Sequence, residues 1–285
     1  MKIELSQCCY RYHHYITGHE YAVRDINLVI HSSQITGFIG PNGAGKSTLI
    51  YMLAGLLKPL KGKVFVDGID LYKSKAGLVD FRKSLALVSQ FPEDQFFTDS
   101  VYQEMSFGLK KQGLSEQVIR KRVIDSLQEV DLDEKSILGR SPDELGGGER
   151  RLVCIAMALV RQPKILILDE PTVGLDTVSS CRVWEILRTL SQMSDITIIL
   201  VSHELDKLAS WTDYLFLMHE GRIKADGSPK EIFSQPQVLS KLGLRVPQLI
   251  ALGYELKEAG LQYEEWPVFE LAAAEAAIKK WLDIA

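Results

Sequence analysis

The residues with the most distinctive chemistry form a glycine-rich stretch early in the chain. Residues 40–47 read Gly-Pro-Asn-Gly-Ala-Gly-Lys-Ser and match in full the pattern GxxxxGK followed by Ser or Thr. The glycines let successive backbone N–H groups surround phosphate groups, and the start of the following helix adds partial positive charge. Lys46 would neutralise the β- and γ-phosphates, and the hydroxyl of Ser47 would bind Mg²⁺. The predicted nucleotide contacts are Asn42, Gly43, Ala44, Gly45, Lys46, Ser47 and Thr48.

Two carboxylates follow a predicted buried strand in the second half of the chain. The apolar run Ile165–Leu168 leads directly into Asp169 and Glu170. Asp169 would hold Mg²⁺ through a water molecule, and Glu170 would act as a base that polarises the attacking water. Alone, this pair would be read as the acidic start of a loop before Pro171. Beside a complete phosphate loop, the catalytic interpretation is favoured.

Short apolar strands and the helices between them must position these residues. The phosphate stretch follows the expected strand Ile35–Ile39 and opens a helix expected from about Ser47 to Leu57. The acidic pair precedes an expected helix, Val178–Met193, and an expected strand, Ile196–Val201. Apolar strands without alternation are typical of a parallel sheet that is covered on both faces. The sequence therefore predicts an α/β fold with a P-loop core.

The regions around this core have other patterns. Residues 1–39 read as short strands, and Val64 and Val66 before an Asp67-Gly68 turn predict a hairpin, which together suggest an N-terminal β subdomain. A further strand is expected at Leu85–Ser89.

A mainly helical subdomain is expected at about residues 91–162. One of its helices has apolar residues at helical spacing and is expected to be capped by Ser115, and a second should run from about Glu149 to Arg161. The spaced residues of the first helix are Ile119, Val123, Leu127 and Val130.

The pattern changes again near residue 230. Residues 228–231 form a capping box with proline at the first helical position, and the last segment carries apolar residues at helical spacing. We therefore divide the chain into a nucleotide-binding domain at 1–230 and a helical extension at 231–285. The apolar stripe at the end of the extension has two interpretations, a cover for the chain's own core or a dimer contact, and the second is favoured.

Composition excludes several classes of protein. The 285 residues carry a net charge of −4, so no overall basic field would recruit nucleic acid. No apolar run reaches the roughly 18 residues that span a bilayer, and the N-terminus shows no signal-peptide core. The cysteines match no zinc or redox motif, which favours idle thiols in a reduced, cytosolic compartment. They are Cys8, Cys9, Cys154 and Cys181.

Further motifs occur in a fixed order with the phosphate loop, and together they resemble the ATPase subunit of an ABC transporter. The run Leu145, Gly146, Gly147, Gly148 and Glu149 resembles the signature motif of this family. The resemblance implies roles for Gln90 as the Q-loop glutamine and Mg²⁺ ligand, Asp176 as the D-loop residue and His203 as the switch histidine. It also implies that Tyr12 stacks on adenine, although the neighbours Tyr10 and Tyr15 remain alternatives.

A closer resemblance is to the energy-coupling-factor ATPases, which drive uptake of vitamins and transition-metal ions. The stretches 90–97, 105–108 and 227–233 carry it. The resemblance implies ATP and Mg²⁺ as cofactors, and a second ATPase subunit, identical or paralogous. It also implies a transmembrane scaffold subunit, a substrate-binding membrane subunit and a peripheral position on the cytoplasmic side of the cell membrane. In such a pair, each ATP lies between one phosphate loop and the partner's signature. Acidic Glu93 and Asp94 would either face a basic coupling helix or form a solvated loop.

The signature departs from the family pattern at two positions. Gly146 stands where the family usually has serine, and Glu149 stands where glutamine is typical. A hydrogen bond to a charged group is worth roughly 1.5–3 kcal/mol, so loss of the serine should slow hydrolysis rather than abolish it. The slower site should be the one that contains the partner's phosphate loop. Two other functions compete with transport, namely a soluble ABC-type ATPase in repair or translation and a low-turnover regulatory subunit.

Overall fold

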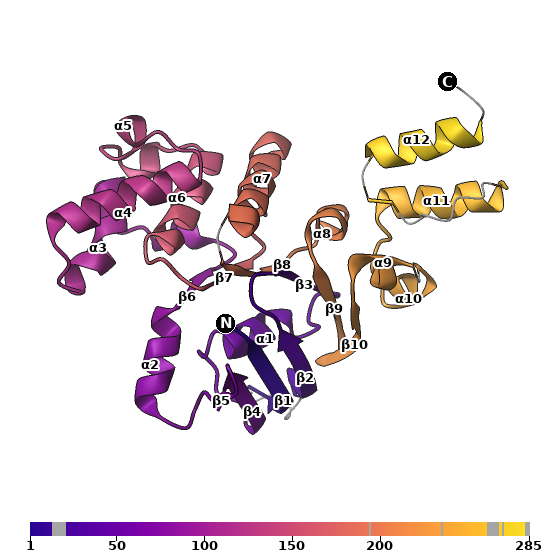
Figure 1. The fold of residues 1–285 in the computed structure, drawn as a ribbon, viewed down its shortest axis with the longest axis horizontal. Helices are drawn as coiled ribbons and strands as arrows, with labels where there is room; N and C mark the ends of the chain where they lie inside the picture. Colours follow the sequence, from indigo (N-terminus) through magenta and orange to yellow (C-terminus); the bar gives the residue numbers. More distant parts are fainter. Residues whose placement is uncertain (13–20, 194, 235, 261–267, 270, 283–285) are drawn as a thin grey trace.

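A six-stranded sheet forms the core of the molecule. The computed structural model describes residues 1–12, 21–193, 195–234, 236–260, 268–269 and 271–282 (Figure 1). In this sheet the strand order is β10-β9-β3-β8-β7-β6, and all neighbours are parallel except β9 and β10. The strands are β3 (Ile35–Ile39), β6 (Leu85–Val88), β7 (Ile165–Asp169), β8 (Thr197–Val201), β9 (Tyr214–His219) and β10 (Arg222–Gly227).

A smaller antiparallel sheet lies beside the core. Its order is β2-β1-β4-β5, and each neighbouring pair is antiparallel. Its strands are β1 (Ile3–Tyr10), β2 (Val23–Ile30), β4 (Lys61–Val66) and β5 (Ile69–Asp70). The hairpin expected at the Asp67-Gly68 turn is the β4–β5 pair. The predicted combination of a parallel core sheet with an N-terminal antiparallel sheet is confirmed.

Both faces of the core sheet are buried, and β7 shows how. All five of its residues are buried, with Ile165 and Ile167 in the apolar cluster shared with the antiparallel sheet and Leu166 and Leu168 in the cluster on the other side. Since successive side chains of a strand point to opposite faces, a strand covered twice must be apolar throughout. The covering helices are α1 (Lys46–Leu53) between the sheets, and α7 (Thr177–Met193) and α8 (Leu205–Trp211) on the other face.

The helical subdomain lies at one end of the molecule, beyond the edge strand β6, which α2 (Lys75–Lys83) precedes in the chain (Figure 1). It contains η1 (Pro92–Gln95), α3 (Val101–Lys111), α4 (Glu116–Glu129), α5 (Glu134–Ile137), η2 (Pro142–Glu144) and α6 (Gly147–Leu159). Ser115 is the N-cap residue of α4, but its side chain makes no capping hydrogen bond, so that detail of the prediction is wrong.

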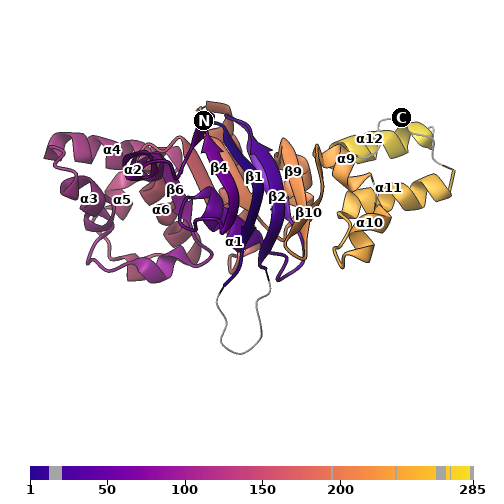
Figure 2. The ribbon, with the colours of Figure 1, turned by 90° about the horizontal axis from the view of Figure 1, so that it is seen from below.

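The C-terminal helices lie at the opposite end (Figure 2). They are α9 (Pro229–Phe233), α10 (Pro236–Lys241), α11 (Gln248–Glu258) and α12 (Leu271–Trp281). Leu239 and Ile250 belong to the main apolar core, so α10 and α11 cover the chain's own interior. In α12, Ala274 is buried whereas Leu271 is 72% exposed, so this helix leaves part of its apolar stripe uncovered. The boundary near residue 230 stays a prediction.

Candidate functional site

The phosphate loop connects β3 to α1 in a conformation that requires glycine. Gly40 has φ +153°, and a Cβ at this position would lie 2.3 Å from the carbonyl oxygen of Met218. Gly45 has φ +97° immediately before the first residue of α1. Lys46 is buried and its Nζ donates to the carbonyl oxygens of Gly40, at 2.7 Å, and Pro41, at 3.1 Å. Burial lowers the pKa of Lys46, although Glu170 and Asp169 act in the opposite direction.

A cavity of about 290 Å³ brings most of the predicted site residues together. Residues 42–48 form one wall, and Gln90, from the end of β6, lies at another. Asp169, Glu170 and His203 complete it from the ends of β7 and β8. In a parallel sheet these strand ends meet at one edge, where ligands of open α/β folds bind. The tertiary structure therefore assembles a phosphate site from segments that are far apart in the sequence.

Asp169 and Ser47 provide oxygen atoms beside Lys46. Burial raises the pKa of Asp169, and a hydrogen bond with Ser47 and the charge of Lys46 oppose that rise. With Gln90 on the same cavity, the donor set is a carboxylate, a hydroxyl and an amide, which suits Mg²⁺ because this ion keeps several waters and takes few protein ligands. In the part of the chain that the structure describes, no three His, Cys, Asp or Glu residues cluster as a self-contained metal site.

Glu170 is held in an uncommon conformation at the end of β7. Its φ is +52°, and its backbone N–H donates to the carbonyl oxygen of Val201 at 2.9 Å. Its Oε2 accepts from the backbone N–H of His203 at 3.2 Å, and the imidazole Nε2 lies 3.2 Å from Oε1. Oε1 is buried and accepts no hydrogen bond from the described residues. Burial raises the pKa of this carboxyl to about 7, which suits a base that acts near neutral pH.

Tyr12 lies next to the cavity without forming its wall. Its hydroxyl is 3.3 Å from Oγ1 of Thr48, and its ring packs edge-on against Tyr10 with centroids 5.2 Å apart. Tyr12 is 39% exposed. The alternative Tyr15 lies outside the described residues. A role for Tyr12 in stacking on adenine stays a prediction.

The signature motif lies away from its own chain's cavity. Its residues stand at the start of α6, and none of them is among the cavity residues. Gly146 is exposed, and its N–H donates to the Glu149 carboxylate at 3.1 Å. Arg140 forms an ion pair with that carboxylate at 3.3 Å. A helix N-terminus favours anions, but here a carboxylate of the same chain already occupies part of it.

The D-loop residue Asp176 caps α7. It accepts from the backbone N–H groups of Val178 and Ser179, both at 3.0 Å, and from the Ser179 hydroxyl at 2.7 Å. The hydrogen bonds from Ser179 lower its pKa. A Cβ at Gly148 would lie 2.5 Å from Oγ of Ser179, so the signature packs closely against the first turn of α7, which follows the D-loop.

Two charged residues near the site were missed in the sequence. Arg151 is buried on α6, and Glu204, next to the switch histidine, accepts from the hydroxyls of Thr172 and Ser180. An arginine on the apolar face of a helix, next to Leu152 and Val153, was the available signal for the first.

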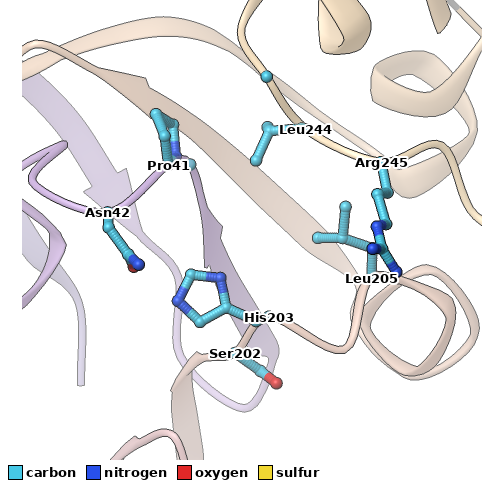
Figure 3. Close-up of a pocket in the computed structure, with 9 residues that line it drawn as sticks. Pro41, Asn42, Ser202, His203, Leu205, Leu244 and Arg245 are labelled. Carbon is cyan, nitrogen blue, oxygen red and sulfur yellow. The ribbon is translucent and has the colours of Figure 1, made fainter.

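A second pocket, of about 390 Å³, shares two residues with the nucleotide cavity, Asn42 and His203. Figure 3 shows the imidazole of His203 between Asn42 and Ser202, with Leu244 and Arg245 from the C-terminal extension on the opposite side. The extension therefore reaches the edge of the nucleotide site.

The fold and the site define a P-loop nucleoside triphosphatase. The sequence model described as "ABC transporter" matches residues 23–173. The chain is 41% identical over 240 residues to the energy-coupling factor transporter ATP-binding protein EcfA2 of Caldanaerobacter subterraneus subsp. tengcongensis, with 84% of each chain covered. It is 35% identical over 285 residues to the protein of that name from Clostridium acetobutylicum, with 100% of this chain and 99% of the relative covered.

A solved structure agrees with these relatives. It is cbiO1 from Clostridium perfringens, described as part of the ABC transporter complex cbiONQ, with a TM-score of 0.75 and 34% identity. The match covers 90% of this chain and 98% of cbiO1. The chain belongs to the ABC transporter family of ATP-binding proteins. ATP is therefore its nucleotide, and the resemblance predicted from its motifs is confirmed.

Proposed function

We propose that this chain is the ATP-hydrolysing subunit of an energy-coupling-factor ABC importer, and that it powers uptake of a vitamin or a transition-metal ion. The observation that carries the proposal is the cavity where Lys46 faces Glu170, whose buried Oε1 accepts no hydrogen bond from the described residues. Over nearly its whole length the chain is similar to proteins named as ATP-binding subunits of such transporters.

Each residue of the cavity has a separate task in hydrolysis. Lys46 leaves its two loop carbonyl oxygens to bind the β- and γ-phosphates, and Glu170 takes the proton of the attacking water. His203 orients Glu170 through the contacts described above, and Gln90 lies where the γ-phosphate would be sensed. Ser47 and Gln90, and Asp169 through water, would hold Mg²⁺, whose charge would help to neutralise the phosphates.

A second cassette, identical or paralogous, completes the site. Since the signature residues of this chain lie outside its own cavity, we assign them to the nucleotide of the partner. The N-terminus of α6, with exposed Gly147, would present backbone N–H groups to that nucleotide, whereas the N–H of Gly146 already donates to Glu149.

The membrane scaffold subunit would dock on the segment that follows Gln90. Phe91, Phe97 and Phe107 are all at least 41% exposed, and the rings of Phe97 and Phe107 pack with centroids 4.9 Å apart. Exposed aromatic clusters of this kind are typical of interaction sites. Neither of the two interpretations of Glu93, a contact with a partner's base or a solvated loop, holds in this structure, because its carboxylate pairs with the buried Arg151 of its own chain at 3.1 Å. Asp94 is exposed and remains available.

Attachment to a scaffold and a substrate-binding subunit would place the chain at the cytoplasmic face of the cell membrane. Among the helices that the structure describes, none is both long and apolar enough to cross a bilayer. We propose no nucleic-acid partner.

The outer helix of the extension would contact the second cassette. α12 exposes Leu271, and Leu282 follows it 50% exposed. Replacing both with glutamate should weaken nucleotide-free association in sedimentation experiments. Deleting the whole extension is a poorer test, because Leu239 and Ile250 belong to the core.

The test of transport is uptake by the complete complex in vesicles. The chain should co-purify from native membranes with membrane subunits. Reconstituted vesicles should accumulate the cargo only when ATP is enclosed in the lumen, on the side of the ATPase. Glu170→Gln should abolish uptake, while Glu185→Gln, at an exposed position of α7, should not. Copurification with soluble partners alone would favour a cytosolic ATPase, and turnover that stays negligible with all membrane subunits present would favour a regulatory subunit.

A further inference from the structure

Arg151, on the signature helix α6, lies at the junction of three segments that serve the nucleotide site. Only 1% of the residue is exposed. Its Nη1 donates to the carbonyl oxygens of Glu170, at 3.4 Å, and Pro171, at 3.1 Å. Its Nη2 donates to the carbonyl oxygen of Val173 and to Oε1 of Glu93, each at 3.1 Å. One guanidinium thus joins the signature helix, the loop after the catalytic strand and the segment after Gln90.

The carbonyl contacts matter because the backbone of Glu170 is strained. A non-glycine residue with positive φ persists where its surroundings hold it, and φ is +52° here. Val201 holds the N–H of Glu170, as described above, and Arg151 holds the carbonyl side of the same residue. The backbone of Glu170, which carries the catalytic carboxylate, is therefore held at both its N–H and its C=O.

The ion pair with Glu93 makes this arrangement depend on the segment after Gln90. A guanidinium so deeply buried needs a counter-charge, since removing one member of a buried pair leaves the other uncompensated. Glu93 supplies it from η1, 58 positions away in the sequence. Oε2 of Glu93 is buried and makes no hydrogen bond within the described residues. The hydrogen bond from Arg151 to Oε1 is therefore the main polar contact of this carboxylate.

We propose that Arg151 is a positioning residue for Glu170, and that Glu93 holds Arg151 in place, so that the segment 92–95 controls the catalytic carboxylate from outside the nucleotide cavity. Neither Arg151 nor Glu93 is a cavity residue. Both act through the backbone of the loop 170–173 rather than on the nucleotide. The proposal rests on the role of Glu170 as the base.

The first test separates positioning from nucleotide binding, in the complete complex. Arg151→Lys keeps the charge but cannot reproduce a planar fork that donates to four oxygens. We expect kcat for ATP to fall at least tenfold, toward the value of Glu170→Gln, while KM for ATP stays within about threefold because the phosphate loop is untouched. Arg161→Lys, which alters a surface arginine just beyond α6, is the matched control and should leave both unchanged. A kcat within twofold of the parent, or an equal loss of ATP affinity, would overturn the proposal.

The second test separates positioning from a merely structural ion pair. Glu93→Gln leaves the guanidinium uncompensated and should lower both Tm and kcat, whereas Asp99→Asn, at an exposed position between η1 and α3, should change neither. The double variant Arg151→Met with Glu93→Gln removes both charges, so Tm should return toward that of the parent. Its kcat should remain at least tenfold low, because the carbonyls of the loop are no longer held. Recovery of kcat together with Tm would show that the pair only stabilises the fold.

Discussion

His203 contacts the carboxylate of Glu170 twice, once through its imidazole and once through its backbone N–H. Nε2 lies 3.2 Å from Oε1, and the backbone N–H of the same histidine donates to Oε2 at 3.2 Å. Burial lowers the pKa of His203, so the ring is neutral near pH 7, and burial raises the pKa of Glu170 to about 7. A neutral ring and a readily deprotonated carboxyl are the states that a base and its orienting partner require.

Replacing Glu170 with glutamine should abolish hydrolysis without weakening ATP binding. Loss of a general base typically lowers the rate about 10²- to 10⁴-fold, while Lys46 and the phosphate loop still bind the phosphates. The variant should therefore trap ATP-bound assemblies, which size-exclusion chromatography with ATP would detect. If it hydrolyses ATP at the parent rate, Glu170 is not the base.

The same substitution should change stability in a pH-dependent way. Since the pKa of Glu170 rises from 4.5 to about 7 on folding, its contribution to stability is fully present below pH 4.5 and is lost as pH rises through 7. Glutamine does not titrate, so the Tm of Glu170→Gln relative to the parent should increase between pH 5 and pH 8. Differential scanning fluorimetry measures this difference. The exposed control Glu185→Gln should show a flat difference, and a flat difference for Glu170→Gln as well would contradict the raised pKa.

Restoring serine at position 146 should speed hydrolysis at the site that contains the partner's phosphate loop. Gly146 has φ −64°, and the nearest atom to an added Cβ is Oε2 of Glu149, at 3.9 Å, so serine fits. A hydrogen bond to a charged group, made in the transition state, would be worth about 10- to 100-fold. Single-turnover rates at each composite site would test this, with Gly139→Ser, which has open space around it, as control. Unchanged single-turnover rates at both composite sites would contradict this prediction.

Glu149→Gln should strengthen ATP binding at the same composite site. The amide oxygen can still accept from the N–H of Gly146, but the negative charge at the N-terminus of α6 is removed. Charge effects at a helix terminus are typically about 0.3–1 kcal/mol, so KM for ATP should fall about two- to fivefold. Glu144→Gln is the matched control, because Glu144 caps η2 in the same way. A KM that rises would show that the Arg140–Glu149 pair matters more than the charge.

Gly148→Ala should destabilise the contact between the signature and the first turn of α7, which follows the D-loop. The new methyl would lie 2.5 Å from Oγ and 3.0 Å from Cβ of Ser179, which also bonds Asp176. Overpacking of this kind costs about 1–3 kcal/mol, so Tm and ATPase activity should both fall. Gly139→Ala, where an added Cβ meets nothing within 4 Å, should have no effect. Equal Tm values for the two variants would contradict the close packing.

Local patterns predicted the elements well, and their errors have physical causes. The strand Ile35–Ile39 occurs with the expected bounds, whereas the helix expected to end near Leu57 ends at Leu53. Gly55 has φ +67° two positions later, a common helix stop that the sequence already contained. No such local signal could have predicted the ion pair of Glu93, because its partner Arg151 lies 58 positions away in the sequence.

By itself, the sequence determined the phosphate loop, the acidic strand end and the family. These depend on contiguous residues whose backbone geometry and side-chain chemistry are set within a few positions. Only the tertiary structure decided that His203 supports Glu170 across 33 positions, that Arg151 holds the catalytic loop, and that the signature points away from its own chain's nucleotide cavity. Such contacts arise where strand ends and helix starts meet, and the order of strands in a sheet is a property of the whole chain.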